Sequence, residues 1–145
     1  MTVDDSGPGE CAPEMINVTI AVLRNRRPAD GVQTPTPCEQ GWVPGTLDTD
    51  GEPVRVLLVT NVDSLPGTIR PVRPIGLLTG TKHRAVVAVP HERYGPGFAD
   101  IHELTDLPPT LVERLCVGFG HTDRGTTEQA RMIIRAGIEQ FAARG

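Results

Sequence analysis

The chain has 145 residues, a formal net charge of −4 and 22% charged residues, which fits one soluble domain that buries roughly 70% of its unfolded surface. It contains no basic–aromatic patch of the kind that binds nucleic acid and no apolar run of the ~18 residues that span a membrane. The amino terminus lacks a secretory signal pattern, and the three cysteines include no C-x-x-C pair, so we expect a cytoplasmic protein with reduced thiols.

The first part of the chain divides into an arm, a strand and a loop. Residues 1–14, MTVDDSGPGECAPE, are polar and rich in glycine and proline, which predicts an arm that is disordered or draped over the surface. Residues 15–23, MINVTIAVL, form a β-branched apolar run that predicts a strand. Residues 23–37 show no apolar period and are expected to form a loop. The arm therefore precedes one domain, residues 15–145.

The middle of the chain has the character of strands. Extended structure resumes at residues 41–43, and residues 54–60 form a nearly unbroken apolar run, as in a strand buried on both faces. The stretch LPGTIRPVRPIGLL indicates a turn at Pro66-Gly67 followed by two short strands. Residues 85–90, AVVAVP, predict another buried strand.

Two helices are expected in the last third of the chain. Thr105 or Asp106 suits the N-cap of the first, which should run from Pro109 to about Val117. A capping box and an apolar stripe at helical spacing define the second, through Thr126 with Gln129 and through Ala130, Ile133, Ile134, Gly137, Ile138 and Phe141. Five or six short strands followed by two helices predict an α+β fold, in which helices pack a small closed or half-closed sheet.

Residues 47–56, LDTDGEPVRV, place several charged side chains directly before an apolar run. Along an extended backbone, with Gly51 between them, the carboxylates of Asp50 and Glu52 can point to one side. Arg55 adds a permanent cation on the face opposite the neighbouring valines. The pattern favours a site at the mouth of a sheet. An ordinary charged turn is the alternative, because D-G followed by E-P is common turn chemistry.

A family resemblance is carried by Asp50-Gly51-Glu52-Pro53-Val54-Arg55, by Arg73-Pro74-Ile75-Gly76 and by Ala88-Val89-Pro90-His91. From Gln40 to about Gly125, the chain resembles the soluble family I inorganic pyrophosphatases. In that family the first frame reads Asp-Gly-Asp-Pro-hydrophobic-Asp and supplies magnesium-binding carboxylates. The resemblance implies an OB-like five-stranded β-barrel flanked by two α-helices, and assembly into trimers or hexamers.

The family's site positions are altered in this chain. The first carboxylate is kept as Asp50, the second is lengthened to Glu52, and the third has become Arg55. Gln40 takes the place of a family tyrosine. His83 and Ala85 correspond approximately to a family aspartate and lysine, and Phe119-Gly120 corresponds to a Tyr-Lys pair that binds product phosphate.

These exchanges lead to the hypothesis that the chain does not hydrolyse pyrophosphate. A guanidinium about 4 Å from a carboxylate pair opposes a divalent ion by several kcal/mol at an effective dielectric near 20, so we expect no metal site and no cofactor. The pocket would then bind a largely apolar organic substrate. Its expected catalytic residues are Glu52 as base and Arg55 and Gln40 as hydrogen-bond donors, and its expected substrate-binding residues are Asp50, Trp42, His83 and Phe119.

The reaction expected of such a pocket is a cyclisation, including a [4+2]-type closure, or an isomerisation in specialised metabolism. Two alternatives remain: a non-catalytic pseudoenzyme that binds a ligand or partner, and a weak, diverged phosphohydrolase. An open pocket around Glu52 favours the enzyme, whereas a pocket filled by Arg55 and Trp42 favours the pseudoenzyme. The expected partners are the small-molecule substrate and further copies of the chain, with neither nucleic acid nor a membrane.

Overall fold

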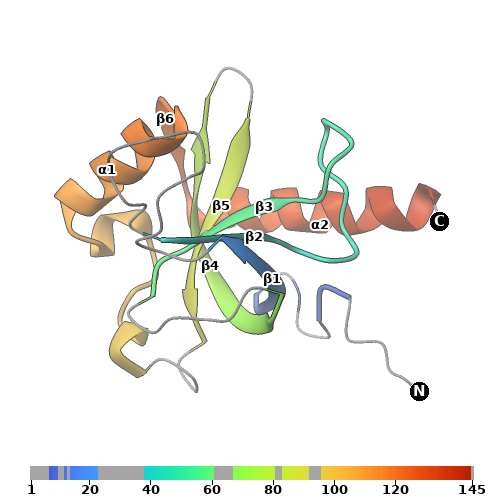
Figure 1. The fold of residues 1–145 in the computed structure, drawn as a ribbon, viewed down its shortest axis with the longest axis horizontal. Helices are drawn as coiled ribbons and strands as arrows, with labels where there is room; N and C mark the ends of the chain where they lie inside the picture. Colours follow the sequence, from blue (N-terminus) through green and yellow to red (C-terminus); the bar gives the residue numbers. More distant parts are fainter. Residues whose placement is uncertain are drawn as a thin grey trace.

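The computed structural model describes residues 7–9, 12, 14–22, 38–60, 67–80, 83–91 and 96–144. Its strands are β1 (Ile16–Val22), β2 (Glu39–Trp42), β3 (Arg55–Leu58), β4 (Ile69–Thr79), β5 (Arg84–Pro90) and β6 (Asp123–Gly125). Its helices are α1 (Pro109–Phe119) and α2 (Thr127–Arg144), and short 3-10 turns lie at Pro96–Phe98 and Leu104–Asp106 (Figure 1).

The strands close into a barrel. The described strands form one sheet in the order β1-β2-β3-β5-β4-β6, and an additional β1–β4 pairing closes the first five of them into a ring. Strands β3 and β5 are parallel, with Val56 opposite Val86, while the other pairs are antiparallel. This confirms the predicted five-stranded barrel flanked by two helices, and β6 adds a short strand to the edge of β4.

Two apolar clusters hold the barrel and its helices together. Val86 and Ala88 of β5 belong to the cluster that includes Ala130 and Ile134 of α2. The alternate residues of β5, among them Val87, belong to the cluster on the α1 side. The unbroken apolar sequence of β5 is therefore buried on both faces, as predicted. No helix in the described part of the chain is both long enough and apolar enough to cross a membrane.

Strand β4 differs from the expectation of two short strands. It is a single strand of 11 residues, with a register shift between Pro74 and Gly76 that accommodates the prolines without ending the strand. Gly76 is required at this point, because a Cβ there would lie 2.3 Å from Leu104 Cγ. Of the predicted turn, Gly67 has a positive φ of 86°, while Pro66 lies outside the described residues, as does the predicted loop after Val22.

The helix boundaries correct two sequence predictions and confirm a third. Pro108 occupies the N-cap position of α1 without a side-chain hydrogen bond, and the carboxylate of Asp106 instead accepts the backbone N–H groups of His102 and Glu103 at 2.9 and 3.0 Å. At the start of α2, Thr126 and Gln129 form the predicted reciprocal capping bonds, at 2.8 and 3.1 Å. Phe141 does not belong to the buried stripe, since it is 47% exposed.

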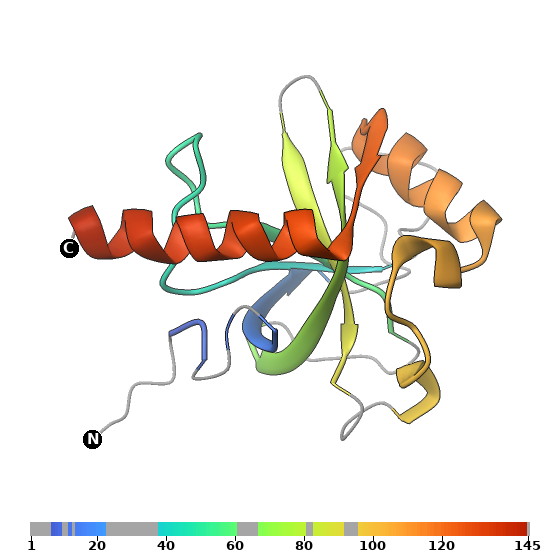
Figure 2. The same ribbon diagram turned by 180° about the vertical axis from the view of Figure 1, so that it is seen from behind.

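Helix α2 runs across the barrel, and its carboxyl-terminal half extends past the strands (Figure 2). There it lies against residues 43–54, which join β2 to β3 and which we call the carboxylate loop. The Leu47 N–H donates to the Gly137 carbonyl at 3.0 Å, and a Cβ on Gly137 would lie 2.9 Å from Val54 Cγ2. The absence of a side chain at Gly137 therefore lets the helix brace the loop that carries the charged residues.

Candidate functional site

Backbone and side-chain hydrogen bonds fold the carboxylate loop into a compact turn. The Thr46 hydroxyl donates to the Val43 carbonyl at 2.6 Å and accepts the Val54 N–H at 3.1 Å, which ties the two ends of the loop together. At the tip, the Asp48 N–H donates to the Glu52 carbonyl at 2.7 Å. Thr46 is buried, so these bonds are shielded from water and the loop presents its acidic side chains from a defined backbone.

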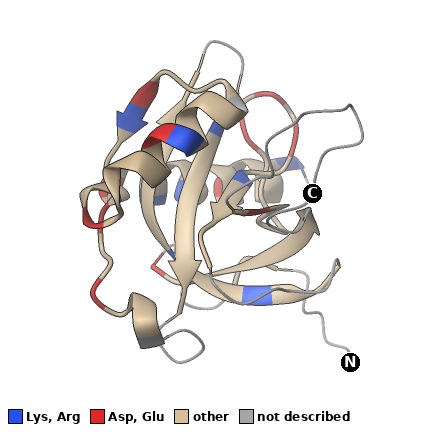
Figure 3. Ribbon diagram, turned by 60° about the vertical axis from the view of Figure 1, so that its left-hand side comes forward, with Lys and Arg blue, Asp and Glu red and all other residues tan. Residues whose placement is uncertain are grey.

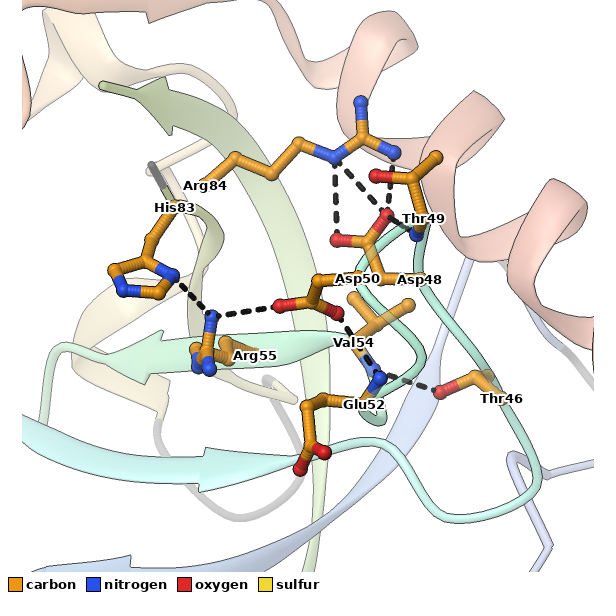
Figure 4. A network of polar contacts seen from close by, with 9 residues as sticks. All are labelled: Thr46, Asp48, Thr49, Asp50, Glu52, Val54, Arg55, His83 and Arg84. Carbon is orange, nitrogen blue, oxygen red and sulfur yellow. Dashed lines mark hydrogen bonds and ion pairs between the residues drawn. The ribbon is translucent and has the colours of Figure 1, made fainter. Parts of the chain in front are cut away.

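Asp48 forms an ion pair with Arg84 at the start of β5 (Figure 4). Arg84 Nε donates to both carboxylate oxygens at 3.1 Å, and Nη2 donates to Oδ1. The side chain of Asp48 is only 9% exposed. Burial by itself would raise the pKa of Asp48, but the Arg84 hydrogen bonds, the Thr49 N–H and the charges of Arg84 and Arg55 outweigh it and hold that pKa below its usual value.

Asp50, Arg55 and His83 form a second chain of contacts. Arg55 Nη1 donates to Asp50 Oδ2 at 3.3 Å and lies 3.0 Å from His83 Nδ1 (Figure 4). A guanidinium is always a donor, so His83 Nδ1 accepts in this arrangement and the imidazole keeps its proton on Nε2. Asp50, and not Glu52, is therefore the acid that pairs with Arg55.

The parallel pairing of β3 and β5 brings the two arginines together. Arg55 begins β3, Arg84 begins β5, and Val56 is in register with Val86. Because parallel neighbours start at the same edge of a sheet, both guanidinium groups lie at one mouth of the barrel. In Figure 4 the ring of His83, which precedes β5, lies beside Arg55, whereas the Arg84 guanidinium lies beyond Asp50, against Asp48.

Asp50 and Glu52 do not lie side by side, contrary to the expectation from an extended backbone. Gly51 between them has a φ of 84°, so the chain turns there and the two-residue alternation of a strand does not apply. Asp50 points toward Arg55, whereas the carboxylate of Glu52 points away from it (Figure 4). The two acids consequently line different hollows.

Three neighbouring hollows lie around these arginines, and a fourth, of about 280 Å³, is lined by Arg84, the carboxylate loop and α2. The central hollow, of about 230 Å³, is lined by Gln40, Gly41, Arg55, Val56, Leu57, His83, Arg84, Ala85 and His121. The acidic hollow, of about 250 Å³, has Asp48, Thr49, Asp50, Thr79 and Gly80 beside the same His83 and Arg84. The outer hollow, of about 400 Å³, is lined by Ala21, Gln40, Gly41, Trp42, Glu52, Pro53 and Arg55. Arg55 thus separates the outer hollow from the central one.

The structure gathers most of the residues that the sequence singled out. Gln40 and Arg55 each line two of the hollows, and His83 lines the central and acidic ones. Trp42, 37% exposed, stands on the wall of the outer hollow. Phe119 ends α1, and its side chain lies outside the described part of the structure.

Three residues that line these hollows were not predicted from the sequence: Asp48, Arg84 and His121. Asp48 and Arg84 are separated by 36 positions in the chain, and only the parallel β3–β5 pairing brings them into contact. His121 follows α1 and is 8% exposed. Burial, and to a smaller extent the nearby His83, lowers the pKa of His121, so its ring is neutral near pH 7. A basic residue directly before an apolar strand was the available signal for Arg84.

The carboxylates do not fit a magnesium site of the kind that the family resemblance implies. Magnesium needs several oxygen ligands in octahedral geometry. Asp48 and Asp50 are each paired with a guanidinium, and Glu52 faces another hollow. Across the described ranges, no group of three or more His, Cys, Asp or Glu side chains could hold a metal ion.

Charged residues are mixed over the ribbon. In the view of Figure 3, acidic and basic positions lie near one another on the described elements, without a continuous basic face.

The known proteins that this chain resembles in sequence are inorganic pyrophosphatases. A family model described as inorganic pyrophosphatase matches residues 21–141. The inorganic pyrophosphatase of Sulfolobus acidocaldarius is 31% identical over 133 residues, covering 79% of this chain and 77% of the relative. That of Xanthomonas axonopodis pv. citri is 32% identical over 166 aligned positions, covering 92% and 93%.

Solved structures agree with this fold. The inorganic pyrophosphatase of Ehrlichia chaffeensis superposes with a TM-score of 0.87 at 22% identity, covering 92% of this chain and 99% of that one. The corresponding values for the Thermus thermophilus protein are 0.82, 24%, 94% and 96%.

These relatives contradict the expected cyclase or isomerase of specialised metabolism, because they are named inorganic pyrophosphatases over most of the chain. The largely apolar organic substrate loses its support for the same reason. The exchange at Arg55 was given too much weight: it changes the charge at one position, and the barrel mouth still gathers groups that suit a phosphate anion.

Proposed function

Because this chain belongs to the inorganic pyrophosphatase family, we propose that it hydrolyses inorganic pyrophosphate at the mouth of its barrel. The observation that carries the proposal is the convergence of Arg55, Arg84 and His83 on the central hollow. Arginine is suited to phosphate oxygens, since its planar fork offers several N–H donors and a permanent charge. The named activity of the relatives is the second support.

The proposed reaction needs a water, a proton acceptor and charge neutralisation. Water attacks one phosphorus, the bond from that phosphorus to the bridging oxygen breaks, and two orthophosphates leave. Arg55 and Arg84 stabilise the negative charge that builds on the departing phosphate. His121 lines the same hollow and is neutral near pH 7, so we assign it as the acceptor of the water's proton.

The test is phosphate release from inorganic pyrophosphate, measured with the full chain in a magnesium buffer and again with chelator. Arg55→Gln should lower kcat/KM by about a hundredfold or more, since cationic contacts to a transferring phosphoryl group are worth several kcal/mol. Arg114→Gln is the matched control, because Arg114 is exposed on α1 and lines none of the three hollows. Folded protein that releases no phosphate above background under either condition overturns the proposal.

The assembly and the cellular location are proposed from the family resemblance. We propose a homo-oligomer, a trimer or hexamer as the family resemblance implies, in the cytoplasm. Both helices leave large apolar side chains exposed, Val117 on α1 and Met132 on α2, at 78% and 57%, and a subunit contact over the helices would bury them. Light scattering coupled to size exclusion measures the mass, and a monomer at micromolar concentration contradicts the assembly.

A further inference from the structure

The three hollows differ in which charges line them. Asp48 and Asp50 line the acidic hollow, and Glu52 lines the outer one. The central hollow between them is lined by Arg55, Arg84, His83, His121 and Gln40, and by no carboxylate among the described residues. Neither Asp48 nor Asp50 lines the central hollow, and each pairs with an arginine that does. This segregation is typical of an anion site whose cations are held in place from outside.

The arginines keep donors beyond those that the acids use. Arg55 engages Asp50 and His83 through Nη1 alone, so within the described residues its Nε and Nη2 donate to no other group. Arg84 uses Nε and Nη2 on Asp48, which leaves Nη1. A guanidinium carries five N–H donors, and both side chains line the central hollow. Arg55 can therefore bind a carboxylate and a phosphate oxygen together, whereas the guanidinium of Arg84 is directed toward Asp48 and α2, at the edge of the hollow (Figure 4).

The same pairs that orient the arginines make the acids poor metal ligands. A divalent ion at Asp48 would have to displace Arg84, whose hydrogen bonds and charge hold the pKa of Asp48 low. At Asp50 it would meet the Arg55 guanidinium 3.3 Å from the carboxylate oxygen. Both exchanges set like charges against one another at close range.

We infer that the central hollow binds inorganic pyrophosphate as the free anion, held chiefly by Arg55 with Arg84 at the edge of the hollow, and not as its magnesium complex. This rests on the proposed function for the identity of the anion, while the mode of binding is independent of turnover. The hollow of about 230 Å³ has room for a small anion, since a water takes ~30 Å³. Gln40 and the Nε2 proton of His83 supply neutral donors beside the two cations.

Titration calorimetry of the full chain with inorganic pyrophosphate tests the inference. With chelator present, pyrophosphate should bind, and added magnesium should weaken the apparent affinity because it withdraws the free anion. Arg55→Gln should weaken binding at least about tenfold, the loss of one charge-assisted hydrogen bond. Arg55→Lys should recover part of the affinity, since it restores the charge without the fork. Arg114→Gln should leave binding unchanged.

Because Arg84→Gln alone strands a buried acid, Arg84 is tested in the paired variant Asp48→Asn/Arg84→Gln, with circular dichroism confirming the fold. This variant should also bind at least about tenfold more weakly. Binding seen only with magnesium, or no binding under either condition, overturns the inference. Binding in chelator without phosphate release would leave the inference standing and overturn the proposed hydrolysis. Phosphate release that needs magnesium, with no binding in chelator, would do the reverse.

Discussion

Arg84 donates through Nε to both carboxylate oxygens of Asp48, at 3.1 Å each, and so joins the carboxylate loop to the start of β5. The pair has two roles. It fixes the acidic tip of the loop against the barrel, and it holds the Arg84 guanidinium in one orientation, toward the carboxylate loop and α2. The predictions below separate these roles.

Replacing Asp48 with asparagine should destabilise the fold by about 1.5–3 kcal/mol near pH 7, the range for hydrogen bonds to charged groups. Because the folded-state pKa of Asp48 lies below its usual value of 3.8, this stabilisation is present above that value and is lost as the pH falls through the lower folded-state pKa. Urea unfolding of both proteins between pH 7 and pH 2 measures the difference. A difference that does not shrink in acid contradicts the assignment.

Arg55→Asp should abolish the binding of free pyrophosphate and create a site that binds magnesium. The variant places a third acid near Asp50 and removes the cation, so free pyrophosphate should no longer bind in chelator and a magnesium titration should give a heat that the parent lacks. The matched control is Arg114→Asp, which makes the same charge change on exposed α1. Identical magnesium titrations of parent and variant would show that position 55 does not control metal affinity.

Gly137→Ala should lower the free energy of unfolding by about 1–3 kcal/mol, because the new methyl group would lie 2.9 Å from Val54 Cγ2. It should also weaken pyrophosphate binding, since the displaced carboxylate loop carries Asp48 and Asp50. Gly118→Ala is the control: nothing lies within 4 Å of a Cβ there, so this helix substitution should stabilise by about 0.5–1 kcal/mol. Equal effects of the two substitutions would contradict the close helix–loop contact.

The thiol of Cys38 should resist alkylation in the native protein. Burial, with a smaller contribution from the charge of Glu39, raises its pKa to about 12, so almost no thiolate exists near pH 8. Iodoacetamide labelling followed by peptide mass spectrometry should modify Cys38 only after denaturation. Rapid labelling of Cys38 in the folded state would contradict its burial.

The local features of the fold could be predicted from the sequence. Thr126 and Gln129 define the start of α2 within a few residues, and the unbroken apolar run of β5 indicates burial on both faces. The barrel itself was inferred from a family resemblance, because strand order depends on pairings between distant segments. Phe141 was misassigned since helical spacing alone does not tell where a helix extends beyond its support.

The candidate site was harder to predict, for two physical reasons. Arg84 meets Asp48 only through the parallel β3–β5 pairing, which no local pattern specifies. Glu52 was expected beside Asp50, but the positive φ of Gly51 sends the two carboxylates apart. The consequence of Arg55 was overstated, because a single exchange of charge was taken to mean a different substrate class.

The β1–β4 pairing has a consequence for how ligand binding can be read. The central hollow draws its walls from β2, β3 and β5, which pair with one another, and β1 and β4 complete the ring around them. Such distant pairings form late and cooperatively in folding. Any anion bound there will raise the melting temperature through mass action. A thermal shift with pyrophosphate would then report that the ring is intact, before any turnover is measured.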